Sequence, residues 1–149
     1  ARSGPPAMHI LDQCDPATSG KKIEDPWVPD LVVLSPGPGR PEDFGLSETI
    51  ERLIKLEIPA FGVCLGLQGV VQYFGGELGV LPYPMHGKPS EVMLVDRNES
   101  FFPIFEGLPH AFEVARYHSL HGVLDTFPNE LRVTALTKDG VVCLYRKLS

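Results

Sequence analysis

Residues 59–76 read PAFGVCLGLQGVVQYFGG, and this segment carries the strongest structural signal in the chain. Residues 60–63 form a short apolar run that is typical of a buried strand. Apolar residues then recur between 67 and 74 at the spacing of a helix, which Gly75 and Gly76 end. A short strand that passes through a glycine-rich turn into a helix predicts an α/β architecture.

The region before this segment shows the same alternation of strand and helix. Residues 31–34 are a continuous aliphatic run, and the turn SPGPG at 35–39 stops it. Apolar residues between 46 and 54 follow the stripe of an amphipathic helix, with Ser47 as its expected N-cap, and the helix should end before Pro59. This order predicts a mostly parallel sheet with flanking helices.

The character of the sequence changes after residue 77, where strand-like runs replace the helical spacing. These runs lie at 91–95, 112–117, 131–137 and 141–145. Asp139-Gly140 separates the last two and is a typical hairpin turn. We therefore expect antiparallel additions to the sheet. Residues 1–29 are rich in proline and show no periodicity, so we expect an irregular lead-in there.

The composition argues against several classes of protein. Hydrophobic residues make up 43% and charged residues 21% of the 149 residues, which is ordinary for a globular domain. The net charge of −6 is spread along the chain, so we expect no nucleic acid as a partner. No apolar stretch reaches the roughly 20 residues of a membrane span, and residues 1–10 do not resemble a secretory signal.

Cysteine usage favours a reducing compartment. Cys14, Cys64 and Cys143 are odd in number and far apart, without the C-x-x-C spacing of a zinc or redox pair. We therefore expect a cytoplasmic location, no metal site and no cofactor.

Cys64 is the candidate nucleophile. It lies in the pattern G-x-C-x-G at 62–66, between a predicted strand and helix, where the G-x-S-x-G motif places a nucleophile on a sharp turn. The partial positive charge at the start of a helix favours a thiolate, so we expect the thiol to be partly ionised. The N–H of Leu65 would then donate to a tetrahedral oxyanion. The alternative is that Cys64 is a small buried apolar residue.

Two further features favour a site around Cys64. The turn at 35–39 follows the neighbouring strand, so both turns should lie at the carboxyl edge of the sheet, where α/β sheets bind ligands. Its glycines free backbone N–H groups for a carboxylate or an oxyanion, although an ordinary surface turn is the alternative. Gln68 follows Cys64 by one helical turn, so its amide can reach a ligand at the thiol unless it faces solvent.

Four segments resemble, in order and spacing, the class I glutamine amidotransferases, and in particular the glutaminase component of anthranilate synthase in its fused forms. They are SPGPGRPEDFG at 35–45, GVCLGLQG at 62–69, MHGKPS at 85–90 and RYHSL at 116–120. The resemblance implies an α/β, flavodoxin-like fold. By this resemblance, residues 30–149 are expected to form a partial glutamine amidotransferase domain. Residues 1–29 are expected to be an irregular lead-in without family resemblance.

The resemblance also implies a mechanism, in which Cys64 attacks the side-chain amide of glutamine, forms a glutamyl thioester and releases ammonia. Gly39 and Leu65 would form the oxyanion hole. The positions that would bind glutamine are Gly37, Pro38, Gly39, Gln68, Ser119 and Leu120, the last two at its backbone end. We interpret His118 as a structural histidine rather than a base, and His86 as a loop contact.

One part of the family pattern is absent from the sequence. The family supplies a base from a His-x-Glu motif after one more strand, and this chain contains no such triplet. We therefore expect a fragment or a degenerate copy, with turnover reduced by about 100-fold to 10,000-fold. Slow acylation of Cys64 by an electrophilic glutamine analogue should survive.

The resemblance implies that glutamine is the substrate and that a chorismate-using synthase component or fused domain is the partner. The reaction would be that of anthranilate synthase, a lyase of tryptophan biosynthesis, and any magnesium would belong to the synthase part. Aminodeoxychorismate synthase of folate synthesis and a phenazine-type amidotransferase are the alternatives within the class. A module that docks on a synthase without catalysis is the alternative from another class.

Overall fold

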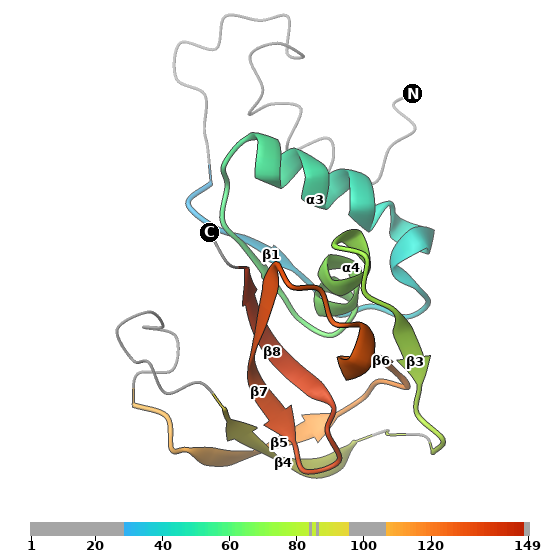
Figure 1. Ribbon diagram of the computed structural model, residues 1–149, viewed down its shortest axis with the longest axis vertical. Coiled ribbons are helices and arrows are strands. Elements are labelled where there is room, and N and C mark those ends of the chain that lie inside the picture. The colour runs from blue at the N-terminus through green and yellow to red at the C-terminus, as the bar shows by residue number, and fades with distance from the viewer. Residues whose placement is uncertain (1–28, 84, 86, 96–106, 148–149) are drawn as a thin grey trace, which may run out of the picture. The chain divides into compact units, whose positions relative to one another are not determined.

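The computed structural model describes residues 29–83, 85, 87–95 and 107–147. The chain divides into two compact units, Ala1–Tyr73 and Phe74–Ser149. Each unit has its own sheets, and Figure 1 labels their helices and strands.

The first unit contains one parallel pair of strands and two α-helices. Its elements are β1 (Val32–Leu34), the 3-10 helix η1 (Pro41–Phe44), α3 (Leu46–Lys55), β2 (Ala60–Gly62) and α4 (Leu65–Tyr73). β1 and β2 are parallel, with Val32 opposite Ala60 and Leu34 opposite Gly62. The predicted order of strand, helix, strand and helix is confirmed, including the end of the first helix before Pro59.

The start of α3 differs from the expectation. Gly45, with a left-handed φ of +59°, is the N-cap residue, and no side chain caps the helix. The prediction of Ser47 as N-cap is wrong because the helix begins one residue before it, directly after η1. Thr49 instead donates its hydroxyl to the carbonyl oxygen of Gly45 at 3.1 Å.

Helix α4 forms the centre of the first unit. It packs against α3 and against both strands, and all its residues from Leu65 to Val71 are buried. Apolar side chains from every element of this unit except β2 complete the core. They are Leu34, Pro41, Ile50, Leu53, Ile58, Leu65, Leu67, Val70 and Val71. Because α4 is buried on all sides, its sequence is mostly apolar and has almost no polar face.

The second unit is built from antiparallel strands. Its elements are β3 (Leu78–Val80), β4 (Lys88–Leu94), β5 (Ala111–Arg116), β6 (Leu120–Gly122), the 3-10 helix η4 (Leu124–Thr126), β7 (Leu131–Thr137) and β8 (Val142–Lys147). β3 and β6 form a pair, and the other strands form a sheet in the order β5-β4-β7-β8. All four predicted runs are strands. The antiparallel strands are hydrogen-bonded to one another in these two sheets.

The β7–β8 hairpin turns where the sequence predicts it. Gly140 has a left-handed φ of +78° and donates its N–H to the carbonyl oxygen of Thr137 at 2.9 Å. Thr137 also bonds Val141 through its hydroxyl, which closes the turn. Asp139 is therefore held at a fixed place beside the sheet.

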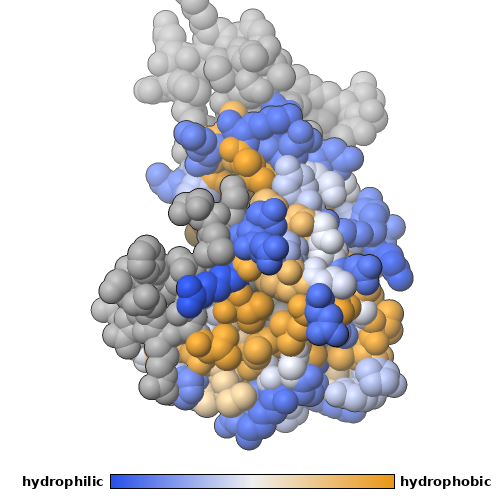
Figure 2. Space-filling view, in the orientation of Figure 1, coloured by the Kyte–Doolittle hydropathy of each residue, from blue (hydrophilic) through white to orange (hydrophobic). Residues whose placement is uncertain are grey.

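Apolar side chains also reach the surface of the second unit, as the orange areas of Figure 2 show. The exposed aliphatic residues of this unit are Val80, Val95, Leu108 and Leu124. Within the described residues, no helix has the length and apolar character needed to cross a membrane.

Candidate active site

Cys64 occupies a strained turn between β2 and α4. Its φ is +52°, in the left-handed region that residues with a side chain rarely adopt. Such a conformation costs about 1–3 kcal/mol and persists only where the surrounding structure imposes it. The sharp strand-to-helix turn expected for the G-x-C-x-G pattern is therefore present, with Cys64 at its apex.

The two glycines of the pattern let the helix approach the strands. A Cβ on Gly66 would lie 2.2 Å from the carbonyl oxygen of Leu34, and a Cβ on Gly62 would lie 2.7 Å from the backbone of Gly66. No side chain fits at either position without movement of the backbone. The turn is further fixed by the N–H of Val63, which donates to the carbonyl oxygen of Leu34 at 2.9 Å.

The thiol of Cys64 is half-buried and free of any disulfide. Burial raises the pKa of this thiol, and the backbone N–H of Leu65, which bonds the sulfur, lowers it by less. The expectation of a partly ionised thiol is therefore wrong in direction, because desolvation outweighs the single N–H donor. A protonated thiol needs a proton acceptor, and residues 29–73, the described part of this unit, contain no histidine.

The loop that follows β1 lies against the turn that holds Cys64. A Cβ on Gly37 would be 2.8 Å from Cδ2 of Leu65, the residue after Cys64. Gly39 takes a left-handed φ of +84°, and the N–H of Arg40 donates to Oδ2 of Asp43 at 2.8 Å. The loop is thus held by the first turn of η1. Both turns lie at the carboxyl ends of the parallel strands, as the sequence predicts.

Gln68 is buried, with 4% of its surface exposed. Its N–H donates to the carbonyl oxygen of Cys64 at 3.0 Å, so it lies one helical turn after Cys64. The alternative of a solvent-facing residue is excluded by this burial.

Ser119 and Leu120 belong to the second unit. The carbonyl oxygen of Ser119 accepts a bond from the N–H of Leu81 at 2.8 Å, and Leu120 begins β6. Among the predicted site residues, the structure thus brings Cys64, Leu65 and Gly37 together in the first unit, with Gln68 one helical turn beyond. His86 lies outside the described residues.

His118 is held by a hydrogen bond to the strand that follows it. Its Nδ1 is 2.8 Å from the carbonyl oxygen of Leu120, so Nδ1 carries the proton that it donates. Burial lowers the pKa of His118, the bond to Leu120 opposes this, and the charge of Arg116 lowers it further. A neutral, hydrogen-bonded ring agrees with the interpretation of a structural histidine.

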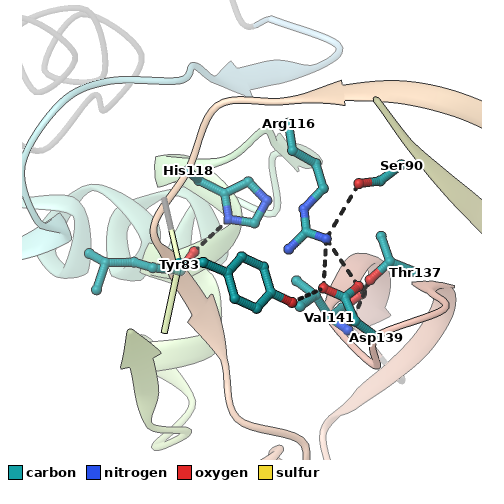
Figure 3. A network of polar contacts seen from close by, with 8 residues as sticks. Tyr83, Ser90, Arg116, His118, Thr137, Asp139 and Val141 are labelled. Atoms are coloured by element: carbon teal, nitrogen blue, oxygen red, sulfur yellow. Dashed lines mark hydrogen bonds and ion pairs between the residues drawn. The ribbon is translucent and has the colours of Figure 1, made fainter. Parts of the chain in front are cut away.

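An ion pair between a buried arginine and a partly exposed aspartate near His118 was not expected from the sequence. Arg116 is 3% exposed, and its Nη1 donates to both oxygens of Asp139 at 3.0 and 2.9 Å and lies 3.5 Å from the hydroxyl of Ser90. Tyr83 donates its hydroxyl to Oδ2 of the same carboxylate at 3.1 Å. Figure 3 shows Arg116 and Tyr83 meeting at Asp139, with Ser90 bonded to Arg116.

The carboxylate of Asp139 is strongly acidic. Partial burial raises its pKa, but hydrogen bonds from Thr137, Arg116 and Tyr83 outweigh this and lower the pKa to about 2. The pair is therefore fully charged at neutral pH. Across the described residues, no three His, Cys, Asp or Glu side chains are grouped as a metal site.

The chain is similar to anthranilate synthases and to an aminodeoxychorismate synthase. It is 54% identical over 114 residues to an anthranilate synthase of Azospirillum brasilense, covering 76% of this chain and 15% of that protein. It is 47% identical over 121 residues to the chloroplastic anthranilate synthase beta subunit 1 of Arabidopsis thaliana, covering 79% and 43%. An aminodeoxychorismate synthase of Streptomyces griseus is 44% identical over 133 residues, covering 83% and 17%. The chain spans less than half the length of each of these relatives.

The fold is that of solved glutamine amidotransferases. The crystal structure of a glutamine amidotransferase from Thermotoga maritima superposes with a TM-score of 0.65 at 23% identity, covering 83% of this chain and 54% of that one. The class I glutamine amidotransferase family matches residues 11–148. The matched range therefore starts before the motif at 35–45. On this match, together with the turn that holds Cys64, the chain belongs to the class I glutamine amidotransferase family.

Proposed function

We propose that this chain acts as the glutaminase of an anthranilate synthase, with Cys64 as its nucleophile. The observation that carries the proposal is the left-handed backbone of Cys64, which presents the thiol on a sharp turn beside the loop of Gly37. A buried, relaxed cysteine would need neither that strain nor the two close-packing glycines.

The reaction would proceed through a covalent intermediate. The sulfur of Cys64 attacks the side-chain amide carbon of glutamine, the carbon–nitrogen bond breaks, and the thiol proton leaves with the nitrogen as ammonia. Water then attacks the thioester, the carbon–sulfur bond breaks, and glutamate and the thiol are restored. Because burial raises the pKa of the thiol, the first step should be faster at higher pH.

The proposed roles of the surrounding residues follow from the family resemblance. The N–H of Leu65 and the backbone of Gly39 would stabilise the oxyanion, a contribution typically worth about 3 kcal/mol per donor. The other proposed contacts to glutamine are those of Gly37, Pro38, Gln68, Ser119 and Leu120. The closeness of Gly37 to Leu65 supports the pairing of loop and nucleophile at one edge.

The proposed pathway is tryptophan biosynthesis, with a chorismate-using component or fused domain as the acceptor of ammonia. The relatives named as anthranilate synthases support this choice, and the Streptomyces aminodeoxychorismate synthase keeps folate synthesis as the second candidate. The cytoplasmic location expected from the sequence stays a prediction, because the Arabidopsis relative is named as a chloroplastic protein.

The proposal is tested by glutamine turnover with the synthase component present. The chain is mixed with a chorismate-using component, glutamine and chorismate, and glutamate and aromatic product are measured for the wild type and for Cys64→Ser. We expect glutamate release that Cys64→Ser abolishes, with anthranilate as the product. Aminodeoxychorismate as the product would contradict the pathway. Stable binding to the component without any thioester or glutamate would establish a docking module instead.

A further inference from the structure

One face of α4 holds the segment that runs from the loop after β1 to the start of α3. Three residues of α4, spaced as i, i+4 and i+7, share this face: Leu65, Gly69 and Gln72. A Cβ on Gly37 would be 2.8 Å from Cδ2 of Leu65, and a Cβ on Gly69 would be 2.7 Å from Cδ1 of Leu46. Nε2 of Gln72 donates to the carboxylate of Glu42. Residues 37–46 are therefore fixed to the helix that begins beside Cys64.

Asp43 holds the backbone of this segment at Gly39. Its Oδ2 accepts the N–H of Arg40 at 2.8 Å, and its own N–H donates to the carbonyl oxygen of Arg40 at 3.1 Å. The same Oδ2 would lie 2.6 Å from a Cβ on Gly39, so the carboxylate packs directly against this glycine. Gly39 has a left-handed φ of +84°. Asp43 therefore occupies the side of Gly39 where a side chain would stand, and it bonds the peptide that follows.

The contacts of Asp43 depend on an oxygen acceptor and not on a negative charge. Its side chain is exposed, and the bond from Arg40 is one that an amide oxygen in the same place could also accept. Because Glu42 ties η1 to α4, Asp43 holds Gly39 at a set position relative to the helix. Asp43 can therefore act on the site without touching a substrate.

We propose that Asp43 is a positioning residue, which fixes the backbone of Gly39 for the oxyanion that forms during attack by Cys64. This inference rests on the proposed function, in which Gly39 and Leu65 stabilise that oxyanion. The oxyanion is absent from bound glutamine, so Asp43 should act on the rate of thioester formation and not on the affinity for glutamine. A displacement of about 1 Å in such a group can lower a rate by about 100-fold.

The test measures thioester formation from the 4-nitrophenyl γ-ester of glutamate by the full chain. The sulfur of Cys64 attacks the ester carbon, the carbon–oxygen bond breaks, 4-nitrophenolate leaves, and the thiol proton passes to water. Because this leaving group needs no proton, the burst of nitrophenolate reports the step in which the oxyanion forms. Cys64→Ser gives the background hydrolysis. Added glutamine competes with the ester, so the concentration that halves the burst rate measures the affinity for glutamine.

We expect Asp43→Ala to lower the burst rate by about 10-fold to 100-fold and to change the affinity for glutamine by less than about 2-fold. Asp43→Asn keeps an oxygen acceptor for the N–H of Arg40 and should restore the rate to within about 3-fold of the wild type. The matched control is Glu48→Ala, which removes a carboxylate from the first turn of α3 and should keep the burst rate. Alkylation of Cys64 by iodoacetamide forms no oxyanion, so Asp43→Ala should not slow it.

Several results would overturn the role of Asp43. They are an unchanged burst rate in Asp43→Ala, an equal loss in Asp43→Asn, and an equal slowing of alkylation by iodoacetamide. If Asp43→Ala does not fold, Gln72→Met removes the tie between η1 and α4 and should lower the burst rate by about 3-fold to 10-fold. An unchanged rate in that variant would then count against the positioning of the loop. A wild type without any burst above Cys64→Ser would overturn the proposed function itself, and the role of Asp43 with it.

Discussion

The carbonyl oxygen of Leu34 lies where a side chain on Gly66 would have to begin, since a Cβ at that glycine would be only 2.2 Å away. β1 and the first turn of α4 are therefore in direct backbone contact. This contact places the loop after β1 next to Cys64. It is possible only because residue 66 is a glycine and has no β-carbon.

Gly66→Ala should consequently destabilise the chain by about 3 kcal/mol, the upper end of the usual cost of overpacking, because a strand and a helix must separate to admit the methyl group. Urea unfolding of the wild type and of each variant measures the free energy of unfolding. The matched control is Gly69→Ala in the same helix, whose Cβ would lie 2.7 Å from Cδ1 and 3.1 Å from Cβ of the Leu46 side chain, with no backbone atom among its nearest neighbours. Because alanine also favours the helix by about 1 kcal/mol, this control should change stability by about 1 kcal/mol or less. Equal losses for both variants would contradict the close packing of β1 and α4.

Asp139→Asn should lower the free energy of unfolding by about 2–4 kcal/mol at neutral pH, since it leaves the buried Arg116 without its counter-ion. The folded carboxylate has a pKa of about 2, below its ordinary value of 3.8. Its stabilising contribution is therefore complete above about pH 4 and is lost as the pH falls towards 2. Acid unfolding of the wild type should show this loss, and the variant should not.

The control for Asp139 is Glu91→Gln, which removes the exposed ion pair between Glu91 and Lys138. That pair is 2.6 Å long, but both side chains are largely in water, so its loss should change stability by less than about 1 kcal/mol. A larger effect for Glu91 than for Asp139 would refute the importance of the Arg116 pair.

His118 should make the second unit less stable at mildly acidic pH. Burial lowers the pKa of His118 in the folded chain, so the unfolded chain takes up the proton first as the pH falls below about 6.5. The free energy of unfolding should then decrease with falling pH until the folded ring also becomes protonated. His118→Gln keeps a donor for Leu120 and should remove this slope.

The matched control for His118 is His121→Gln, which removes a neighbouring ring bonded to the carbonyl oxygen of Gly122 at 3.1 Å. It should keep the slope, because His118 is still present. A slope that persists in His118→Gln would show that another group causes it.

Much of the candidate site could be predicted because its constraints are local. Gly62 and Gly66 flank Cys64 in the sequence and also in space, so the pattern itself encodes the turn. The raised pKa of the thiol could not be predicted, because burial depends on how α4 packs. Arg116 and Asp139 are 23 residues apart and meet only through the pairing of β5, β4 and β7.

The errors in the predicted fold also arise where the structure depends on neighbouring elements and not on the local sequence. Ser47 is a good N-cap by residue type, yet the left-handed Gly45 between η1 and α3 starts the helix earlier. β3 and β6 are three residues long, which is too short for a periodicity to be recognised, and they form only by pairing with each other.

Alkylation of Cys64 by iodoacetamide should become faster with increasing pH and continue to do so above about 8.5, the ordinary pKa of cysteine. The reason is that burial raises the pKa of this thiol. Peptide mass spectrometry separates Cys64 from Cys14 and Cys143, which serve as internal comparisons. A rate at Cys64 that is already constant near neutral pH would indicate a thiolate and contradict the raised pKa.

The decisive measurement is the reaction of Cys64 with a diazoketone analogue of glutamine, followed by peptide mass spectrometry. The analogue should modify Cys64 and leave Cys14 and Cys143 unmodified, and added glutamine should slow the modification. Cys64→Ser should abolish it. A folded chain whose Cys64 stays unmodified, or is modified at a rate that glutamine does not change, would contradict the assignment of Cys64 as the glutaminase nucleophile.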